Sequence, residues 1–207
     1  MSKANLDLSK AKVTKFTELD EPKWVQTNLI KFIDPQGKER DWECCSRKTR
    51  VEGSDCDGVG IIAILEKPSG PEIVLQKQFR PPVEGVCIEF PAGLLDPNET
   101  LETCAERELL EETGYIGKAI KSSPVIFNDP GFCNTNLKLV HVNVDLSDPC
   151  NKNPEPQLEE NEFIESFTVS LANFQKQLEE FAAQGYKIDA RVQNVSDGIE
   201  LAKKYQL

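Results

Sequence analysis

Apolar residues along this chain recur in short runs, many of which alternate with polar residues as in half-buried β-strands. These runs predict strands at residues 24–33, 40–49, 57–65, 72–79, 86–90, 137–146 and 163–169. The first two runs flank the turn-forming segment Asp34-Pro35-Gln36-Gly37, so we expect them to form a hairpin. Apolar residues at helical spacing predict three helices, at residues 98–113, 171–181 and 192–199. Many strands with few helices favour the α+β fold class.

The pattern divides the chain into three segments. Residues 1–22 are predicted to be a flexible leader, residues 23–50 a small β module, and residues 51–207 the main domain. Residues 1–50 carry 11 Lys and Arg against 8 Asp and Glu, whereas the whole chain has a net charge of −11. A basic module beside an acidic body suits an anionic substrate and divalent cations, although chance surface composition would give the same split.

The composition excludes several classes of function. A net charge of −11 disfavours binding to bare DNA or RNA, and no segment reaches the ~20 apolar residues of a membrane helix. The single histidine, His141, excludes His-rich zinc sites, and its place opposite the valines of its strand disfavours a catalytic role. The N-terminus lacks an apolar signal segment and the seven cysteines form no C-x-x-C pair. We therefore expect a cytoplasmic protein with free thiols, with the nucleus and the mitochondrion left open.

The first predicted helix carries acidic residues within its apolar stripe. At about 100° per residue, Glu108 and Glu112 fall inside the stripe, and Glu111 falls at its margin. Carboxylates at this spacing repel one another, and their burial is costly unless cations compensate. Arg107 alone cannot neutralise these three together with Glu99. The simplest source of the missing charge is a divalent ion, and oxygen ligands favour Mg²⁺ or Mn²⁺. The alternative is a solvated acidic face.

The same segment resembles the Nudix box, G-x5-E-x7-R-E-U-x-E-E-x-G-U, in which U is a bulky aliphatic or similar residue. Every fixed position is matched, by Gly93, Glu99, Arg107, Glu108, Leu109, Glu111, Glu112 and Gly114, with Tyr115 at the last bulky position. The resemblance implies an α/β/α sandwich with a mixed sheet. It also implies hydrolysis of a nucleoside diphosphate linked to another group.

The flanks are similar to a narrower group of this family, the ADP-ribose (ADP-sugar) pyrophosphatases. The segments that carry the similarity are Lys23-Trp24-Val25, Trp42-Glu43 with Arg47, Asp57-Gly58-Val59, Gln78-Phe79-Arg80-Pro81-Pro82, Ile88 to Gly93, Asp129-Pro130-Gly131, Glu162-Phe163 and Asp189-Ala190-Arg191. They imply Mg²⁺-dependent hydrolysis of ADP-ribose to AMP and ribose 5-phosphate by a homodimer with shared active sites. Two alternatives stay open: a hydrolase for oxidised nucleoside diphosphates such as 8-oxo-dGDP, and a catalytically silent ADP-ribose sensor, which the intact glutamates disfavour.

The resemblance also implies which residues hold the metal. Glu108 and Glu112 are the implied ligands, together with the main-chain carbonyl of Ala92. Glu111 is implied as a further ligand or as a catalytic residue beside one. Arg107 belongs to the catalytic motif, and we expect it to pair with glutamates of the helix rather than with substrate.

A loop glutamate activates the attacking water in the resembling enzymes. The matching position is Glu162, and Glu159 and Glu160 are the alternatives. Asp57, at the start of a predicted strand, is expected to be structural.

Substrate binding is implied for the two tryptophans and for two arginines. Trp24 and Trp42 would stack on adenine from both sides, one from each subunit, and Glu43 would accept a hydrogen bond from the adenine amino group. Arg47 and Arg80 are the candidates for the diphosphate. Weaker candidates for contact with substrate are the main chain of Leu94 and the side chain of Asp129.

Overall fold

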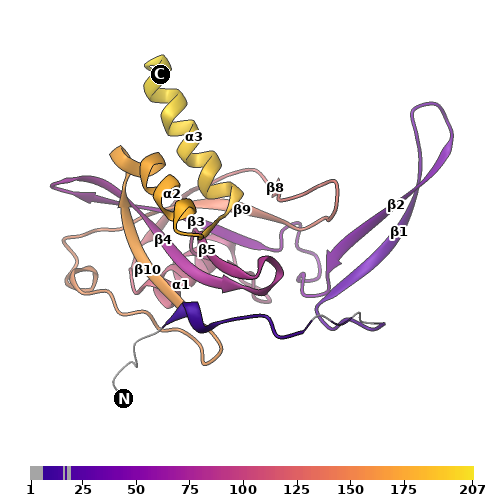
Figure 1. Ribbon diagram of the computed structural model, residues 1–207, viewed down its shortest axis with the longest axis horizontal. Coiled ribbons are helices and arrows are strands. Elements are labelled where there is room, and N and C mark those ends of the chain that lie inside the picture. The colour runs from indigo at the N-terminus through magenta and orange to yellow at the C-terminus, as the bar shows by residue number, and fades with distance from the viewer. Residues whose placement is uncertain (1–6, 16, 18–19) are drawn as a thin grey trace.

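The computed structural model describes residues 7–15, 17 and 20–207 and shows a mixed β-sheet with helices on both faces, beside a two-stranded ribbon (Figure 1). The ribbon consists of β1 (Val25–Ile33) and β2 (Glu39–Arg47). The sheet is built from β3 (Gly58–Lys67), β4 (Gly70–Arg80), β5 (Gly85–Glu89), β6 (Ala92–Leu94), β7 (Lys118–Ser122), β8 (Ile126–Phe127), β9 (Asn136–Asn143), β10 (Ile164–Ser170) and β11 (Lys187–Ile188). The helices are α1 (Leu101–Thr113), α2 (Phe174–Ala183) and α3 (Ala190–Tyr205).

The sheet follows the order β11-β5-β4-β3-β9-β7, while β10 pairs with β4, β6 with β3 and β8 with β9. The pairs β3–β9 and β5–β11 are parallel, and the remaining pairs are antiparallel. Helix α1 packs on one face, and α2 and α3 pack on the other. The expected α/β/α sandwich with a mixed sheet, in the α+β class, is confirmed.

The central strand β3 explains why its sequence is a continuous apolar run. Ile61, Ala63 and Leu65 are buried on the face that carries α1. Ile62 is buried on the opposite face, in the cluster that includes residues of α2 and α3. A strand that is covered on both faces needs apolar residues at odd and at even positions. Strand β9 differs, because its His141 is exposed between the buried Val140 and Val142.

Helix α1 begins and ends with capping contacts that the sequence contains. The hydroxyl of Thr100 accepts a hydrogen bond from the Thr103 N–H at 3.2 Å, which makes Thr100 the N-cap. Gly114 ends the helix at φ 78°, and its N–H donates to the Leu110 carbonyl at 2.8 Å. The expected helix start at Asn98 is wrong, because Asn98 has a φ of 67° and belongs to the preceding turn.

The other predicted strands and helices are present with shifted ends, and short elements were missed. β6, β7, β8 and β11 have two to five residues each, too few for a periodic signal. The connection between β9 and β10 contains one short 3₁₀ turn, Pro149–Lys152. Within the described residues, no helix combines the length and the apolar character needed to cross a bilayer.

The two N-terminal segments, the leader and the ribbon, differ in how they contact the main domain. Of the predicted flexible leader, residues 1–6, 16, 18 and 19 lie outside the described residues. The 3₁₀ turn Leu8–Lys10 belongs to its described part, and the side chain of Leu8 is buried. The predicted hairpin is the β1–β2 ribbon, which projects away from the sheet in Figure 1.

All seven cysteines, including Cys44 and Cys45 of β2, are free thiols.

Candidate active site

Strand β6 lies against the glutamate-bearing face of α1. It pairs with the start of β3, where Gly58 is opposite Leu94 and Val59 is opposite Gly93. A Cβ atom on Gly93 would overlap the carboxylate of Glu108, and a Cβ on Gly58 would overlap the Gly93 carbonyl oxygen. Glycine at these two positions therefore allows strand and helix to approach each other closely. We call this junction of β6 with Glu108, Glu111 and Glu112 the glutamate corner.

Glu112 is the deeper of the two buried carboxylates, with 4% of the residue exposed. Its Oε2 accepts a hydrogen bond from the Ala92 main-chain N–H at 2.8 Å, and its Oε1 accepts one from the Gln76 side-chain amide at 3.2 Å. Burial raises the pKa of Glu112 to about 8, and the charges of Glu108 and Glu162 act in the same direction. At neutral pH this carboxylate therefore needs a cation to be held in its charged form.

All three guanidinium nitrogens of Arg107 donate hydrogen bonds to glutamates. Its Nε and Nη2 donate to Glu99 at 2.8 and 2.9 Å, and its Nη1 donates to Glu108 at 2.8 Å and to Glu111 at 3.0 Å. These hydrogen bonds lower the pKa of Glu99, whereas burial still raises the pKa of Glu108. Arg107 therefore organises the helix glutamates, and in the described part of the chain Glu112 forms no salt bridge.

The chemistry of the corner suits a hard divalent ion. Gln76 is fully buried, and its Oε1 accepts no hydrogen bond from any residue that the structure describes. A buried amide oxygen in that state costs about 1–3 kcal/mol, which a water or an ion shell would offset. Carboxylates and carbonyl oxygens are ligands that Mg²⁺ accepts. Among residues 7–15, 17 and 20–207, no three acidic, histidine or cysteine side chains are already arranged to hold a metal ion. Glu108 and Glu112 are hydrogen-bonded to Arg107 and Gln76.

The loop before β10 brings one further carboxylate toward the corner. Glu162 is half-buried, and its charge contributes to the raised pKa of both Glu108 and Glu112. The Glu159 N–H donates to Glu162 Oε2 at 3.1 Å, and the Glu162 N–H donates to the Glu159 carbonyl at 3.1 Å. Glu159 and Glu160 are exposed, so the geometry favours Glu162 among the three loop glutamates.

A cavity of about 290 Å³ beside β6 is lined by three arginines. Arg47 comes from the end of β2, Arg80 from the end of β4, and Arg191 from the first turn of α3. Ala92, Gly93 and Leu94 line the same cavity. The fold thus brings two candidate arginines, the Leu94 position and the Ala92 position to one cavity, which we call the arginine cavity.

A second cavity, of about 790 Å³, runs along the ribbon and is lined by Trp42 and Glu43. The Trp42 indole N–H donates to the Gly131 carbonyl at 3.1 Å, and Phe132 lines the same cavity. We call it the ribbon cavity. Trp24 lies at the base of the ribbon, is 62% exposed and lines neither of these two cavities.

Two aspartates have different positions near these cavities. Asp57 is buried, and it accepts hydrogen bonds from Arg50 at 2.8 and 2.9 Å and from the Asn136 N–H at 3.0 Å. This network ties the exit of the ribbon to the sheet, in line with a structural role. Asp129 is exposed and lines neither cavity, although the neighbouring Asn128 lines the arginine cavity.

Two residues at the site, Gln76 and Arg191, were not predicted from the sequence. Gln76 interrupts an apolar strand at a position that faces α1, and a polar residue at such a position was the available signal. Arg191 lies in a segment that carries the family resemblance, but its distance along the chain from the motif gave no reason to place it beside Arg80.

Comparison with known proteins places the chain in a family. The NUDIX domain model matches residues 56–191. An ADP-ribose pyrophosphatase from Saccharomyces cerevisiae is 56% identical over 192 residues, covering 92% of this chain and 83% of that protein. An ADP-sugar pyrophosphatase from Mus musculus is 36% identical over 182 residues, covering 87% of this chain and 83% of that protein.

A solved structure supports the same fold. The crystal structure of an ADP compounds hydrolase has a TM-score of 0.57 with 19% identity and covers 78% of each chain. Together with the motif at residues 93–115 and its place at the glutamate corner, these matches show that the chain belongs to the NUDIX domain family.

Proposed function

We propose that this protein hydrolyses the diphosphate bond of ADP-ribose, giving AMP and ribose 5-phosphate, with Mg²⁺ as the metal. The observation that carries the proposal is the placement of the arginine cavity against β6, the strand that also contacts the two buried glutamates. A diphosphate in this cavity would lie next to the corner that needs a cation. The names of the yeast and mouse relatives support the same substrate class.

Glu108, Glu112 and the main-chain carbonyl of Ala92 would hold the ion, with Glu111 beside them. When bound, the ion neutralises charge on the phosphate oxygens and makes the phosphorus easier to attack. Glu112 is held in place by the Ala92 N–H and by Gln76, while Glu108 is held by Arg107. Both carboxylates are thus held at the corner before any ligand arrives, and binding of the ion would require them to exchange some of these hydrogen bonds for contacts with the metal.

Glu162 would take the proton from the attacking water at a carboxylate oxygen. This role requires an ionised carboxylate near the corner that does not itself lie deep in the core. Glu162 is half-buried in a loop, and its charge reaches Glu108 and Glu112. The water then forms the new bond to phosphorus, and the leaving phosphate oxygen departs with the other half of the substrate.

Arg47 and Arg80 would bind the diphosphate in the arginine cavity. Arg80 is already oriented by Glu89, which accepts from its Nε at 3.0 Å and from its Nη2 at 2.7 Å. A guanidinium that is held in this way loses less side-chain entropy when it binds a phosphate. The Leu94 main chain lines the same cavity and would contact the substrate beside these arginines. Asp129 is a weaker candidate, on the loop that follows Asn128.

Adenine binding is proposed for Trp24 and Trp42 in a homodimer. The ribbon register places Val25 opposite Arg47 and Ile30 opposite Trp42. Trp24 therefore lies some six positions along the ribbon from Trp42, a separation of about 20 Å at ~3.3 Å per residue. One adenine cannot touch both rings within a single chain, so the pair requires a second copy. Glu43, which lines the same cavity as Trp42, would accept from the adenine amino group.

The ribbon supports this assembly by the apolar surface that it exposes. Trp24, Leu29, Ile33 and Trp42 are all more than half exposed, and they belong to or adjoin one two-stranded ribbon. Exposed apolar clusters of this kind are typical of interfaces. Light scattering should therefore give the mass of a dimer, and an active monomer would contradict the shared adenine site.

The experiment that tests the function is a substrate panel with Mg²⁺ and with EDTA. ADP-ribose, ADP-glucose, NADH, diadenosine polyphosphates and 8-oxo-dGDP are incubated with the protein, and AMP or other products are quantified. We expect ADP-ribose to have the highest kcat/KM, with turnover abolished by EDTA. A preference for 8-oxo-dGDP would replace the substrate assignment. Tight binding of ADP-ribose without turnover would make the protein a sensor.

A further inference from the structure

We propose that Arg191, in the first turn of α3, binds the diphosphate of the substrate together with Arg80. The inference rests on the proposed function and extends it by a third arginine from a different part of the chain. The observation behind it is that Arg191 lines the arginine cavity beside Arg80 and Arg47. The segment around Arg191 reaches the site only through the fold, because α3 begins directly after β11, the edge strand that pairs with β5.

Arg80 and Arg191 are held in the same way by neighbouring carboxylates. Asp189 accepts from Arg191 Nε at 2.8 Å and from Nη2 at 2.7 Å, and it also caps α3 by accepting from the Arg191 N–H at 2.8 Å. Glu89 accepts from the corresponding nitrogens of Arg80 at 2.7 to 3.0 Å. Each guanidinium therefore has a fixed orientation, with a buried or half-buried acid as its support.

Both guanidinium groups keep donors for a ligand. Within the described residues, Nη1 of Arg80 and Nη1 of Arg191 form no hydrogen bond. The two side chains also lie close enough for the charges of Arg80 and Glu89 both to act on Arg191. Two fixed cations with free donors at one cavity suit an anion that carries more than one negative charge.

A purely structural role explains the position of Arg191 less well. The first turn of a helix favours negative side chains, because the helix dipole places partial positive charge there. Asp189 caps α3 through its own side chain and needs no arginine for that purpose. The cation in this turn of the 16-residue helix is balanced by Asp189, and its Nη1, unpaired among the described residues, leaves a donor for an anion in the cavity.

The test measures binding without metal, so that it is independent of catalysis. Calorimetry in EDTA compares adenosine, AMP and ADP on the wild type, R191Q and R191K. We expect R191Q to leave adenosine affinity unchanged and to weaken ADP binding on the order of tenfold, the loss of one charge-assisted hydrogen bond. R191K should give an intermediate loss, because it keeps the charge without the planar fork.

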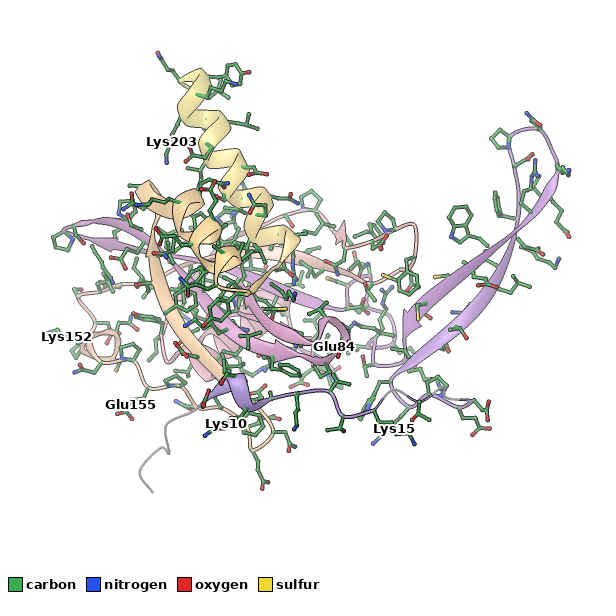
Figure 2. The ribbon with its side chains drawn as sticks, viewed as in Figure 1. Lys10, Lys15, Glu84, Lys152, Glu155 and Lys203 are labelled. Atoms are coloured by element: carbon green, nitrogen blue, oxygen red, sulfur yellow. The ribbon has the colours of Figure 1, made fainter. Side chains whose placement is uncertain are left out.

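The matched control is K203Q, which removes one positive charge from the outward half of the same helix (Figure 2). Lys203 pairs with Glu200 at 2.7 Å, away from the cavity, so ADP affinity should not change. Equal losses for adenosine and ADP in R191Q, or no loss for ADP, would overturn the assignment. If R191Q fails to fold, R191K provides the same comparison. Failure of the wild type to bind any adenine nucleotide would instead contradict the proposed function and with it this inference.

Discussion

The glutamate corner and the β1–β2 ribbon solve opposite physical problems in the same chain. In the corner, Glu108 and Glu112 are acidic groups placed where water is scarce. Glu112 is held by hydrogen bonds from β4 and β6, and Glu108 by the neighbouring Arg107. In the ribbon, Trp24 and Trp42 are apolar groups placed in water, at 62% and 51% exposure. Both arrangements are unfavourable in the isolated chain, and under the proposed function each would become favourable once its partner, a metal ion or an adenine with a second subunit, is bound.

The difference teaches what kind of partner each region needs. Among the described residues the buried Glu112 has no cationic partner, and a small ion is the kind of partner that a buried carboxylate can accept. Exposed tryptophans lack apolar cover, which a nucleobase and a second protein surface can supply. Under the proposed function, chemistry and recognition are thus separated in space, and changes in one region should alter different kinetic constants from changes in the other.

The largest expected effect is that of Glu112→Gln in the corner. The substitution removes the charge that would hold the ion but keeps the shape of the side chain. We expect kcat for ADP-ribose to fall by about a hundredfold or more, with the far-ultraviolet circular dichroism spectrum unchanged. Glu102→Gln is the matched control, because Glu102 is exposed on the first turn of the same helix. Turnover of E112Q close to that of E102Q would remove Glu112 from the metal site.

A second test changes the corner without removing any charge. In Gly93→Ala the new methyl group would overlap the Glu108 carboxylate and also its Cγ, so the buried side chain would have to change its rotamer. We therefore expect kcat to fall about tenfold or more, while the free energy of unfolding drops by about 1–3 kcal/mol. Urea unfolding and initial rates measure the two quantities.

Gly198→Ala is the control for this test. Gly198 lies within α3, and an added Cβ would meet no atom within 4 Å. Alanine should raise the free energy of unfolding by about 0.5–1 kcal/mol with no effect on rate. If G93A destabilised the protein strongly and left the rate per folded molecule unchanged, Glu108 would not depend on this close approach.

The sequence predicted the corner better than the cavity for a physical reason. Glu108, Glu111 and Glu112 lie within one helix, where a period of 3.6 residues fixes which side chains share a face. The alternating pattern likewise predicted the strand faces, and the exposed His141 between buried valines confirms it. Gln76 and Arg191 meet the site only through strand order and the placement of α3. The spacing of apolar and polar residues along the chain does not predict such long-range contacts.

The ends of elements were also harder to predict than the elements. Asn98 and Thr100 are both good N-cap residues, and the choice between them depends on the turn at Asp96. Glu99 accepts from the Asp96 N–H and from Arg107, which leaves the preceding Asn98 in a left-handed conformation outside the helix. The boundary thus coincides with a contact between side chains eight positions apart, which no local pattern reveals.

A third prediction uses pH to measure the cost of the buried charge. Burial raises the pKa of Glu112 from 4.5 to about 8 in the folded, metal-free protein. Its favourable contribution to stability is therefore complete below pH 4.5 and is lost as the pH rises through 8. Between pH 6 and pH 9 we expect the metal-free wild type to lose about 2–3 kcal/mol relative to E112Q, measured by urea unfolding in EDTA.

Added Mg²⁺ should then restore stability mainly at the alkaline end. The wild type at pH 9 should gain more from the ion than E112Q does, because the substitution removes the carboxylate that the ion would neutralise. A wild-type minus E112Q difference that stays constant across this pH range would mean that Glu112 is solvated as an ordinary surface acid.

The smallest expected effect belongs to the ribbon. Trp24→Ala removes an exposed ring that is proposed to stack on adenine in the partner's site, and such stacking is worth about 1–3 kcal/mol per base. We expect KM for ADP-ribose to rise about tenfold while kcat stays within about twofold, because the interaction is the same in the ground state and the transition state. Tyr205→Ala is the control, since Tyr205 is exposed to the same 62% near the end of α3. A KM for W24A equal to that of Y205A would separate Trp24 from adenine, whereas a fall in kcat without a rise in KM would show that the ribbon and the corner are coupled rather than independent.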